Sequence, residues 1–405
     1  MGQASPTHLP ERTRRDLGRT NKRAVMGQIV LGGPVSRTAI CQGTGLTAAS
    51  VSRITRELIE AGLITAEPAP QETGRPGRKF VGLDVAAGGG YVLGIGLNVF
   101  QQAVTLADLK NNRLERRDLN LSDLSNPRVV IDYVIEAARE MIGQHVHHPQ
   151  RLLGGGVAIT GAVDPTTGLL RESPYFGWHD CNLDLGGELS AALGLPIHVE
   201  NLPNALNLAE VRFGHVRAAR NTLLVHCALG LGGSLYLDGQ LTRGDRFAAG
   251  QIGNLPITVD EDRVATLDDL SGGRGILVAM GYAGTEPADE MASNLLAAID
   301  LANGGDADAT IIMEQAGATL GQSLAKFCGL VQPEAIVLSG PLPAAAAYLE
   351  SCRAGLARYW PTESAPVTII VSDLSNQAAA RWLAIGEFLV ERDLNLENLK
   401  LAGAA

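Results

Sequence analysis

The pattern of apolar residues changes near Tyr91, and this change restricts the possible folds more than any other feature of the sequence. Between residues 21 and 61, three short helical patterns follow one another. From Tyr91 to about residue 391, apolar strands alternate with helical stretches. Such an alternation is typical of a mixed α/β body, whereas a run of short helices indicates a separate module. We therefore expect a small helical head followed by a larger α/β body.

The head has the sequence pattern of a helix-turn-helix. A first helix is expected over about residues 22–31. Ser36 is a good N-cap for a second helix, and Thr47 is a good N-cap for a third over residues 48–61. The turn at residues 43–46 contains two glycines. A helix, a short glycine-containing turn and a second helix form the motif that places a recognition helix in the major groove of DNA.

A basic wing is expected directly after the third helix. Strands beginning at Leu63 and returning at residues 79–83 would enclose the sequence Gly-Arg-Pro-Gly-Arg at residues 74–78. Extended arginines of this kind can enter a narrow minor groove, although an ordinary basic turn would have the same sequence. The third helix adds small, hydroxyl and basic side chains that suit base edges and phosphates. The residues predicted to contact DNA are Ser36, Thr47, Ala48, Ala49, Ser50, Ser52, Arg53, Arg56, Arg75 and Arg78.

The charge distribution agrees with a polyanion that meets only the head. The chain has a net charge of −10, but residues 1–82 carry +6 and the remainder carries −16. A merely solubilising surface would give the same asymmetry. Residues 1–20 are polar and basic, so we expect a flexible arm and no secretory signal. No apolar run is long enough for a membrane helix. The five scattered cysteines indicate reduced thiols in the cytoplasm.

Several glycine-rich stretches of the body stand in or after apolar strands. They are found at residues 94–96, 230–233 and 339–341. Glycine turns let backbone N–H groups approach phosphate or sugar oxygens, but they also serve as simple tight turns. Three such turns in one body favour a ligand cleft.

The order of the body segments resembles the ROK family of repressors, open reading frames and kinases. The likeness runs from about Lys22 to about Glu391. Four motifs carry it: the turn Ile-Thr-Gly-Ala-Val-Asp-Pro, the segment Gly-Trp with the helix after it, the motif His-Val-Glu-Asn-Leu-Pro-Asn-Ala and the motif Ala-Gly-Gln-Ile-Gly-Asn, at residues 159–165, 177–193, 198–205 and 249–254.

This resemblance implies a winged helix-turn-helix joined to a two-lobed, actin-like sugar-kinase fold with ribonuclease H-like lobes. The implied division of the chain is a flexible arm at 1–20, a winged helix-turn-helix at 21–84 and a ROK domain at 88–405. Within the ROK domain, the smaller lobe takes about 88–200 plus a C-terminal helix at about 376–392, and the larger lobe takes about 201–375.

The departures from the family pattern argue against catalysis. Leu202 stands where family kinases have the aspartate that serves as general base, and leucine cannot accept a proton. Bulky residues at 97–99 replace the first phosphate turn. The family's zinc cysteines are missing near residues 260–267, and Asn254 replaces the histidine that completes the zinc site. We therefore predict no catalytic residue, no metal and no cofactor.

The polar residues that remain could still bind a sugar. By the resemblance, Asn201 keeps a sugar-contacting amide, while Gln251, Asn254 and Asp268 stand at other polar positions of the family's sugar site. Gly161 belongs to the same set. These groups could equally cap turns around an empty cleft. Since the pair Leu202-Pro203 makes the site more apolar than in glucose-binding relatives, glucose is not transferred as the ligand.

The predicted function is a sugar-responsive, DNA-binding transcription regulator, a repressor of carbohydrate uptake or catabolism genes. Its expected partners are an operator in double-stranded DNA, arranged as an inverted repeat, a small sugar effector, and further copies of the chain in a homodimer or homotetramer. No membrane is involved. Two alternatives stay open: an active sugar kinase with an appended head, and a regulator controlled by a protein partner rather than by a sugar.

Overall fold

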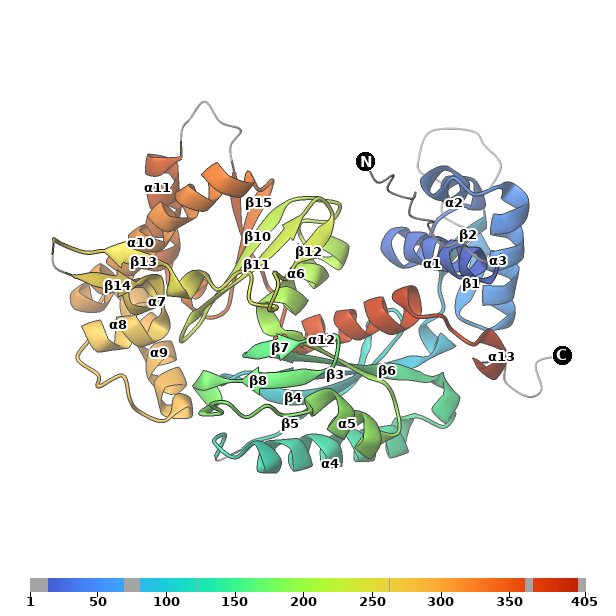
Figure 1. The fold of residues 1–405 in the computed structure, drawn as a ribbon, viewed down its shortest axis with the longest axis horizontal. Coiled ribbons are helices and arrows are strands. Elements are labelled where there is room, and N and C mark those ends of the chain that lie inside the picture. The colour runs from blue at the N-terminus through green and yellow to red at the C-terminus, as the bar shows by residue number, and fades with distance from the viewer. Residues whose placement is uncertain (1–13, 69–80, 122, 262, 361–366, 400–405) are drawn as a thin grey trace, which may run out of the picture.

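The computed structural model describes residues 14–68, 81–121, 123–261, 263–360 and 367–399. These residues form three units, a helical head and two α/β lobes, which Figure 1 shows with the head at the right. No helix in this part of the chain is both long and apolar enough to span a membrane.

The head is a three-helix unit with a two-stranded antiparallel sheet. The predicted N-caps are confirmed, because the Ser36 hydroxyl accepts the Ala39 N–H at 3.1 Å and the Thr47 hydroxyl accepts the Ser50 N–H at 3.3 Å. Gly62 follows the third helix with φ of +69°, a conformation that favours glycine. The elements are α1 (Arg14–Gly32), α2 (Arg37–Thr44), α3 (Ala48–Glu60), β1 (Ile64–Pro68) and β2 (Val81–Val85).

The flexible arm was predicted too long. Residues 14–20 belong to helix α1, so the expected arm at 1–20 is wrong for that part, and residues 1–13 lie outside the described chain. The long-range contact that extends the helix could not be read from local sequence, since the Arg19 guanidinium pairs with the Asp393 carboxylate at 2.7 Å. Arginine and leucine in this stretch also favour helix.

The smaller lobe is built on a five-stranded sheet in the order β5-β4-β3-β6-β9. Strands β3, β6 and β9 run parallel, and β4 and β5 complete an antiparallel edge. Helices α4 and α5 cover one face (Figure 1). The elements are β3 (Tyr91–Leu97), β4 (Gln102–Asp108), β5 (Arg113–Asp118), α4 (Pro127–His145), β6 (Leu152–Ile159), β7 (Ala162–Asp164), β8 (Leu169–Glu172), α5 (Leu185–Leu193) and β9 (Ile197–Asn201), with 3₁₀ turns at Ala87–Gly89, Pro149–Arg151 and Pro174–Phe176.

Helix α12 (Asn376–Ile385) covers the other face of this sheet and continues as a π-helical segment, Gly386–Glu391, before α13 (Leu396–Leu399). Glycines in the sheet make this close packing possible. A Cβ added to Gly156 would lie 2.1 Å from the Ala380 carbonyl oxygen, and one added to Gly154 would lie 2.4 Å from the Phe388 ring. Gly94 and Gly96 lie inside β3 against the same helix. They are packing residues, so the prediction of a ligand turn at 94–96 is wrong.

The larger lobe has a second five-stranded sheet in the order β12-β11-β10-β15-β16. Helix α6 (Leu202–Phe213) leads into it from the smaller lobe, and the antiparallel hairpin of β13 (Pro256–Thr258) and β14 (Val264–Thr266) forms a separate two-stranded sheet. The remaining elements are β10 (Thr222–Cys227), β11 (Leu231–Leu237), β12 (Gln240–Thr242), α7 (Leu267–Ser271), α8 (Gly273–Ala279), α9 (Ala288–Asn303), α10 (Ala307–Val331), β15 (Ala335–Ser339), α11 (Ala346–Tyr359) and β16 (Thr368–Val371), with 3₁₀ turns at Ile252–Asn254 and Leu342–Ala344.

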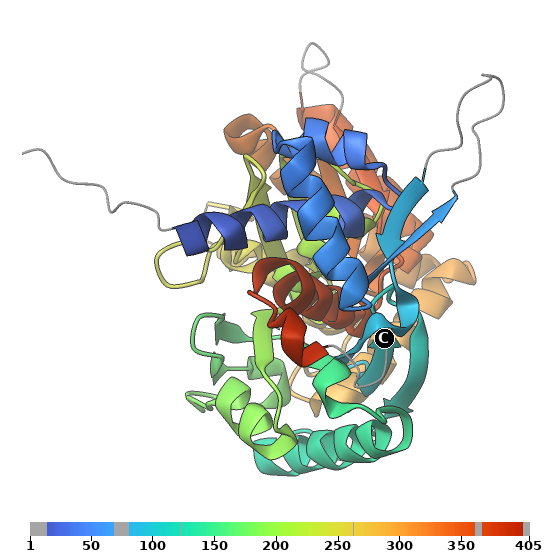
Figure 2. The same cartoon turned by 90° about the vertical axis from the view of Figure 1, so that its right-hand side faces the viewer.

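The head shares its core with the smaller lobe. One continuous apolar cluster contains Met26 and Leu58 of the head, Leu153 of β6 and Phe388 and Leu389 of the C-terminal segment, all buried. Figure 2 shows the C-terminal helix between the head above it and the smaller lobe below it. Because apolar burial is cooperative across such a cluster, the head docks firmly on this lobe.

Candidate ligand cleft and DNA-reading surface

A cleft of about 350 Å³ lies between the two lobes. This volume falls in the range of small-molecule sites, about 300–1,000 Å³. All five residues predicted at the ligand line it, namely Gly161, Asn201, Gln251, Asn254 and Asp268. They come from distant parts of the chain, so the fold brings the predicted set together.

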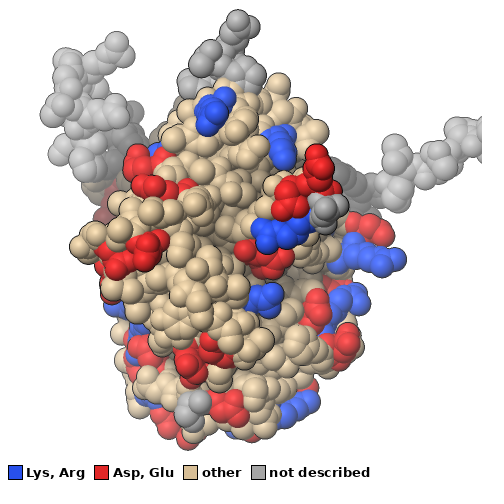
Figure 3. Space-filling model, turned by 90° about the vertical axis from the view of Figure 1, so that its left-hand side faces the viewer, with Lys and Arg blue, Asp and Glu red and all other residues tan. Residues whose placement is uncertain are grey.

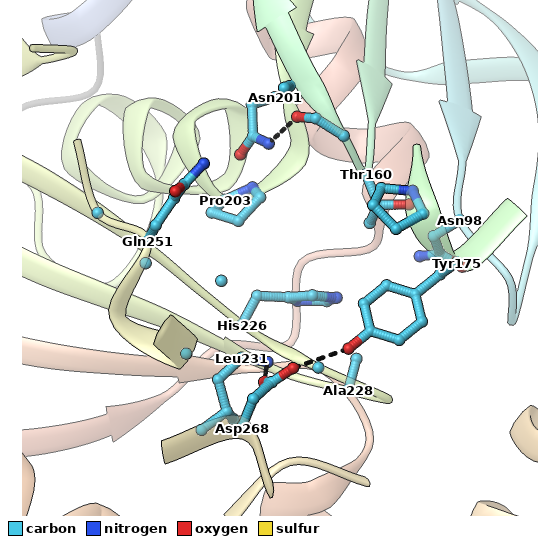
Figure 4. Close-up of a pocket in the computed structure, with 18 of the residues that line it drawn as sticks. Asn98, Thr160, Tyr175, Asn201, Pro203, His226, Ala228, Leu231, Gln251 and Asp268 are labelled. Atoms are coloured by element: carbon cyan, nitrogen blue, oxygen red, sulfur yellow. Dashed lines mark hydrogen bonds between the residues drawn. The ribbon is translucent and has the colours of Figure 1, made fainter. Parts of the chain in front are cut away.

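Asn201 ends strand β9 and stands before helix α6. Its side-chain amide donates to the Gly161 carbonyl at 2.5 Å, and this bond leaves the amide oxygen for other partners. Gly161 has φ of +156°, and a Cβ there would lie 2.4 Å from the Glu172 carbonyl oxygen. The two predicted residues therefore hold each other in place at one wall of the cleft (Figure 4).

Gln251 and Asn254 form part of the cleft rim. Both side chains are exposed, and the Asn254 amide donates to the Gln251 side-chain oxygen at 3.3 Å. The loop before them is tied to the opposite lobe by Arg243, which bonds the Glu200 carboxylate at 2.7 Å. Glu200 is buried and directly precedes Asn201. This ion pair positions the rim loop against the wall that carries Asn201.

Asp268 is engaged by the protein itself. Its Oδ1 accepts the Leu231 N–H at 2.5 Å, and its Oδ2 accepts the Tyr175 hydroxyl at 2.9 Å across the cleft (Figure 4). Burial raises the pKa of Asp268, and burial beside this carboxylate raises the pKa of Tyr175. The Asp268 carboxylate thus accepts one hydrogen bond from its own lobe and one from Tyr175 of the smaller lobe, and so it connects the two lobes. The sequence did not reveal this role.

The two turns that would face a nucleotide phosphate in a kinase have backbone N–H groups that are bonded within the protein. In the first turn, the Asn98 side chain accepts the N–H groups of Phe100 and Gln101 at 2.9 and 2.8 Å. In the second turn, Asp268 takes the Leu231 N–H, and Tyr175 lies so close to Gly230 that a Cβ there would be 2.1 Å from the tyrosine oxygen. Backbone donors that are already bonded are poor phosphate ligands.

The position of the lost general base faces the core. Leu202 is fully buried among Ala158, Ala379 and Ala380, whereas its neighbour Pro203 lines the cleft. The sequence analysis expected both Leu202 and Pro203 to make the cleft apolar. Of this pair, only Pro203 contributes apolar surface to the cleft. No carboxylate replaces the missing base at the start of α6.

Several polar residues of the cleft were missed by the sequence reasoning, and three of them stand out. His226 is the penultimate residue of strand β10 and lies in the middle of Figure 4, with its Nδ1 3.1 Å from the Ser339 hydroxyl oxygen. Burial lowers the pKa of His226 to about 4, so the imidazole is neutral. Buried atoms of Thr160 (Oγ1) and Asn204 (Oδ1) have no hydrogen-bond partner. Orphaned polar atoms beside a cleft are the groups that a hydroxylated ligand would satisfy.

The cleft lining has no cation. Among the described residues that line it there is no lysine or arginine, and its one histidine is neutral. A phosphorylated ligand would lack a counter-charge here, so the lining fits an uncharged, hydroxylated molecule. Strands β13 and β14 contain no cysteine. In the described chain, no three metal-binding side chains of the His, Cys, Asp or Glu type lie close enough together to hold an ion.

Helix α3 presents the predicted reading surface of the head. Val51, Ile54 and Leu58 are buried, and the opposite face is open to solvent. The predicted residues of this helix and its N-cap are exposed or half-buried, namely Thr47, Ala48, Ala49, Ser50, Ser52, Arg53 and Arg56. Ser36, the N-cap of α2, is half-buried.

The two arginines of α3 differ in their partners. Arg53 pairs with Glu57 at 2.5 Å, whereas Arg56 forms no ion pair within the described chain. Arg56 is thus the cation of this helix that is free to meet a phosphate. Arg75 and Arg78 of the predicted wing lie outside the described residues.

The chain belongs to the ROK family, whose model matches residues 92–387. Among curated relatives, the DNA-binding transcriptional dual regulator NagC of Escherichia coli K12 is 26% identical over 347 residues, 82% of this chain and 84% of that protein. The transcriptional repressor Mlc of the same organism is 25% identical over 356 residues, 85% and 86%. The xylose repressor of Bacillus spizizenii is 24% identical over 384 residues, 93% and 97%.

Solved structures agree with this placement. A ROK family transcriptional regulator, a homologue of the E. coli Mlc protein, matches with a TM-score of 0.74 at 25% identity and covers 95% of this chain and 99% of its own. A ROK glucokinase of Streptomyces griseus matches with a TM-score of 0.61 at 19% identity, over 73% of this chain and 98% of its own, which shows the shared fold. The regulator covers far more of this chain than the kinase, and the fold is that of a ROK regulator.

Proposed function

We propose that this protein is a DNA-binding transcriptional repressor whose cleft binds a small, uncharged, hydroxylated effector of the sugar class. The relatives named above include repressors and a dual regulator, and the protein is not an enzyme. The observation that carries the effector proposal is the state of the cleft. Its two phosphate turns are bonded internally, yet its lining keeps amides, hydroxyls and unpaired polar atoms.

The proposed ligand contacts follow from this geometry. We assign Asn201, Gln251 and Asn254 as amides that meet hydroxyl groups, with Gly161 shaping the wall and Asp268 holding the two lobes together. Thr160 and Asn204 join this set because their buried oxygens lack partners. Pro203 offers an apolar surface for one face of a sugar ring. No cofactor or metal is assigned to the site.

The proposed DNA contacts place α3 in the major groove of double-stranded DNA. Small side chains at residues 48 and 49 suit close approach to base edges, and Arg56 suits a phosphate. Arg75 and Arg78 are proposed to enter the adjacent minor groove. Action on chromosomal DNA places the protein in the cytoplasm.

We further propose a homodimer or homotetramer that reads an inverted repeat. Figure 3 shows one face of the molecule, on the side of the larger lobe, with a broad central area free of charged side chains. Exposed apolar side chains of that lobe include Val278, Leu296 and Leu301. Exposed apolar side chains on a face with few charges favour self-association, and two copies of a helix-turn-helix read two half-sites. Sedimentation analysis of the full chain tests this, and a monomer at micromolar concentration would contradict it.

The effector proposal is tested by calorimetry with paired ligands. Each free sugar of a broad panel is titrated into the full-length protein alongside its phosphate ester. We expect at least one free sugar to bind and its phosphate ester to bind at least about tenfold more weakly, because the cleft lining has no cation. Asn201→Ala removes an amide of the cleft and should weaken sugar binding. Arg139→Ala changes an exposed residue away from the cleft and serves as the matched control. Silence across the whole panel would instead favour control by a protein partner.

A further inference from the structure

Arg151 is a buried arginine at the junction of the head and the smaller lobe. It ends the 3₁₀ turn before β6, its side chain is 7% exposed, and burial lowers its pKa. Its Nη1 donates to the carbonyl oxygens of Ala61 at 2.8 Å and Gly89 at 2.7 Å. No carboxylate of the described chain pairs with it. Because guanidinium stays protonated, this contact places an ionic charge in the interior that needs compensation.

The end of the recognition helix supplies that compensation. Ala61 is the C-cap of α3, and the last carbonyls of a helix carry the negative end of its dipole. Gly62, which follows in a left-handed conformation, leaves space for the guanidinium, since a Cβ there would lie 3.3 Å from Nη2. The arginine of the smaller lobe therefore caps the helix that carries the proposed DNA contacts.

Strand β6 connects this contact directly to the cleft. The strand begins at Leu152, immediately after Arg151, and ends at Ile159, immediately before Thr160 and Gly161 of the cleft wall. It is a central strand, paired on both sides with β3 and β9. A strand held in this way moves as a unit with its sheet.

The larger lobe contacts the head differently. Its Arg217 side chain donates to the Leu31 carbonyl at the end of α1, and the exposure of Arg217 and Leu31 marks this as a surface contact. The apolar core of the head is instead continuous with the smaller lobe. Closure of the cleft would therefore move the larger lobe relative to a body made of the head and the smaller lobe.

We propose that Arg151 fixes the orientation of helix α3 on the smaller lobe and so couples the position of the cleft wall to the DNA-reading surface. The functional interpretation of this coupling rests on the proposed function. The orientation itself is a property of the free protein. Arg151 acts here as a positioning residue, and it is not among the residues that line the cleft.

The test is a distance distribution between two spin labels in the full-length protein. One label replaces exposed Ala49 on α3 and the other replaces exposed Tyr133 on α4, both introduced as a ketone-bearing amino acid so that the native cysteines stay unlabelled. Pulsed dipolar spectroscopy is expected to give one narrow peak. Arg151→Met is expected to lose that single peak and give a broad distribution, while thermal unfolding shows that the protein is still folded.

Two further variants keep the test decisive. Arg139→Met is the matched control, because Arg139 also bonds a carbonyl near a helix C-terminus, that of Ala192 at 2.8 Å, but away from the head. It should keep the narrow peak. Arg151→Lys retains a cation at the helix end and should keep it too, and a broad distribution for this variant would overturn the charge argument. If Arg151→Met does not fold, Arg151→Gln replaces it.

An unchanged narrow peak in a folded Arg151→Met or Arg151→Gln protein would overturn the inference. The experiment needs neither DNA nor effector. Absence of DNA binding would therefore refute the proposed function and leave the inference on Arg151 intact. An unchanged peak in the Arg151 variants would refute that inference and leave the proposed function intact.

Discussion

The hydrogen bond between Tyr175 and Asp268 joins the two lobes through a pair of side chains 93 positions apart. A hydrogen bond to a charged group contributes about 1.5–3 kcal/mol. We expect Tyr175→Phe to lower the free energy of unfolding by an amount of this order, measured by urea denaturation. Tyr133→Phe, at a 49% exposed position, should change it little.

A double-mutant cycle tests whether the two groups act together. If the bond exists in solution, Asp268→Asn combined with Tyr175→Phe costs less than the sum of the single changes. Strict additivity would show that the lobes are held by other contacts.

His226 predicts a distinct dependence of stability on pH. Burial lowers its pKa to about 4, whereas an unfolded histidine titrates near 6.5. Between these two values the unfolded chain takes up a proton that the folded chain does not. The contribution to stability is therefore complete above about pH 6.5 and is lost as the pH falls towards 4, by about 3 kcal/mol in total.

The measurement compares unfolding midpoints of the wild type and His226→Gln from pH 7 to pH 4. The wild type should lose more stability than the variant over this range, with exposed His148→Gln as the control. Parallel curves for the wild type and His226→Gln would show that the imidazole is not buried in its neutral form.

The sequence predicted the residues of the cleft better than their bonding. All five residues assigned to the ligand line the cleft because motif positions fix their place in the fold. The bridge at Asp268 was missed because Tyr175 lies far away along the chain and carries no periodic signal. His226 was missed because a histidine inside an apolar strand has the pattern of ordinary core.

Among the elements, helix α3 allows the role of its N-cap residue in stability to be tested apart from its proposed role in binding DNA. Thr47 caps the helix, and aspartate is an equally good N-cap. We expect Thr47→Asp to keep the melting temperature of the protein but to weaken binding to duplex DNA, since a carboxylate then faces phosphates. Asn126→Asp, at the N-cap of α4, adds the same charge far from the head and should bind DNA as the wild type does. Equal DNA affinity of the two variants would remove α3 from the interface.

Arg56 and Arg53 offer a second test on the same helix. Arg56 forms no ion pair within the described chain, whereas Arg53 is paired with Glu57. If Arg56 neutralises one phosphate, Arg56→Ala should reduce the slope of log affinity against log salt by about one. The slope is measured by fluorescence anisotropy on a labelled duplex, and an unchanged slope would contradict the contact.

Local signals predicted most elements because caps and glycines act over a few residues. Ser36 and Thr47 were assigned as N-caps from sequence, and the structure shows both hydroxyls in that role. The start of α1 was wrong because its partner, Asp393, lies near the other end of the chain. Gly94 and Gly96 were taken for a turn because the sequence does not show that α12 packs against them.

In the whole molecule, the two lobes differ in how they contact the head. The smaller lobe shares a core with the head, and the larger lobe meets the head at a surface hydrogen bond. Domain closure needs an effector that interacts differently with the open and closed arrangements. Groups on both lobes face the cleft, including Asn201 and Gln251, so a bound sugar would favour closure.

The central claim is that an uncharged sugar in the cleft changes DNA binding by the head. The most direct measurement selects duplexes from the source genome with the full-length protein and then titrates the best duplex with and without each free sugar of the panel. We expect one preferred duplex, of inverted-repeat form, whose affinity falls on addition of a sugar and is insensitive to that sugar in Asn201→Ala. A protein that selects no duplex, or whose selected duplex ignores every sugar that binds the cleft, would contradict it.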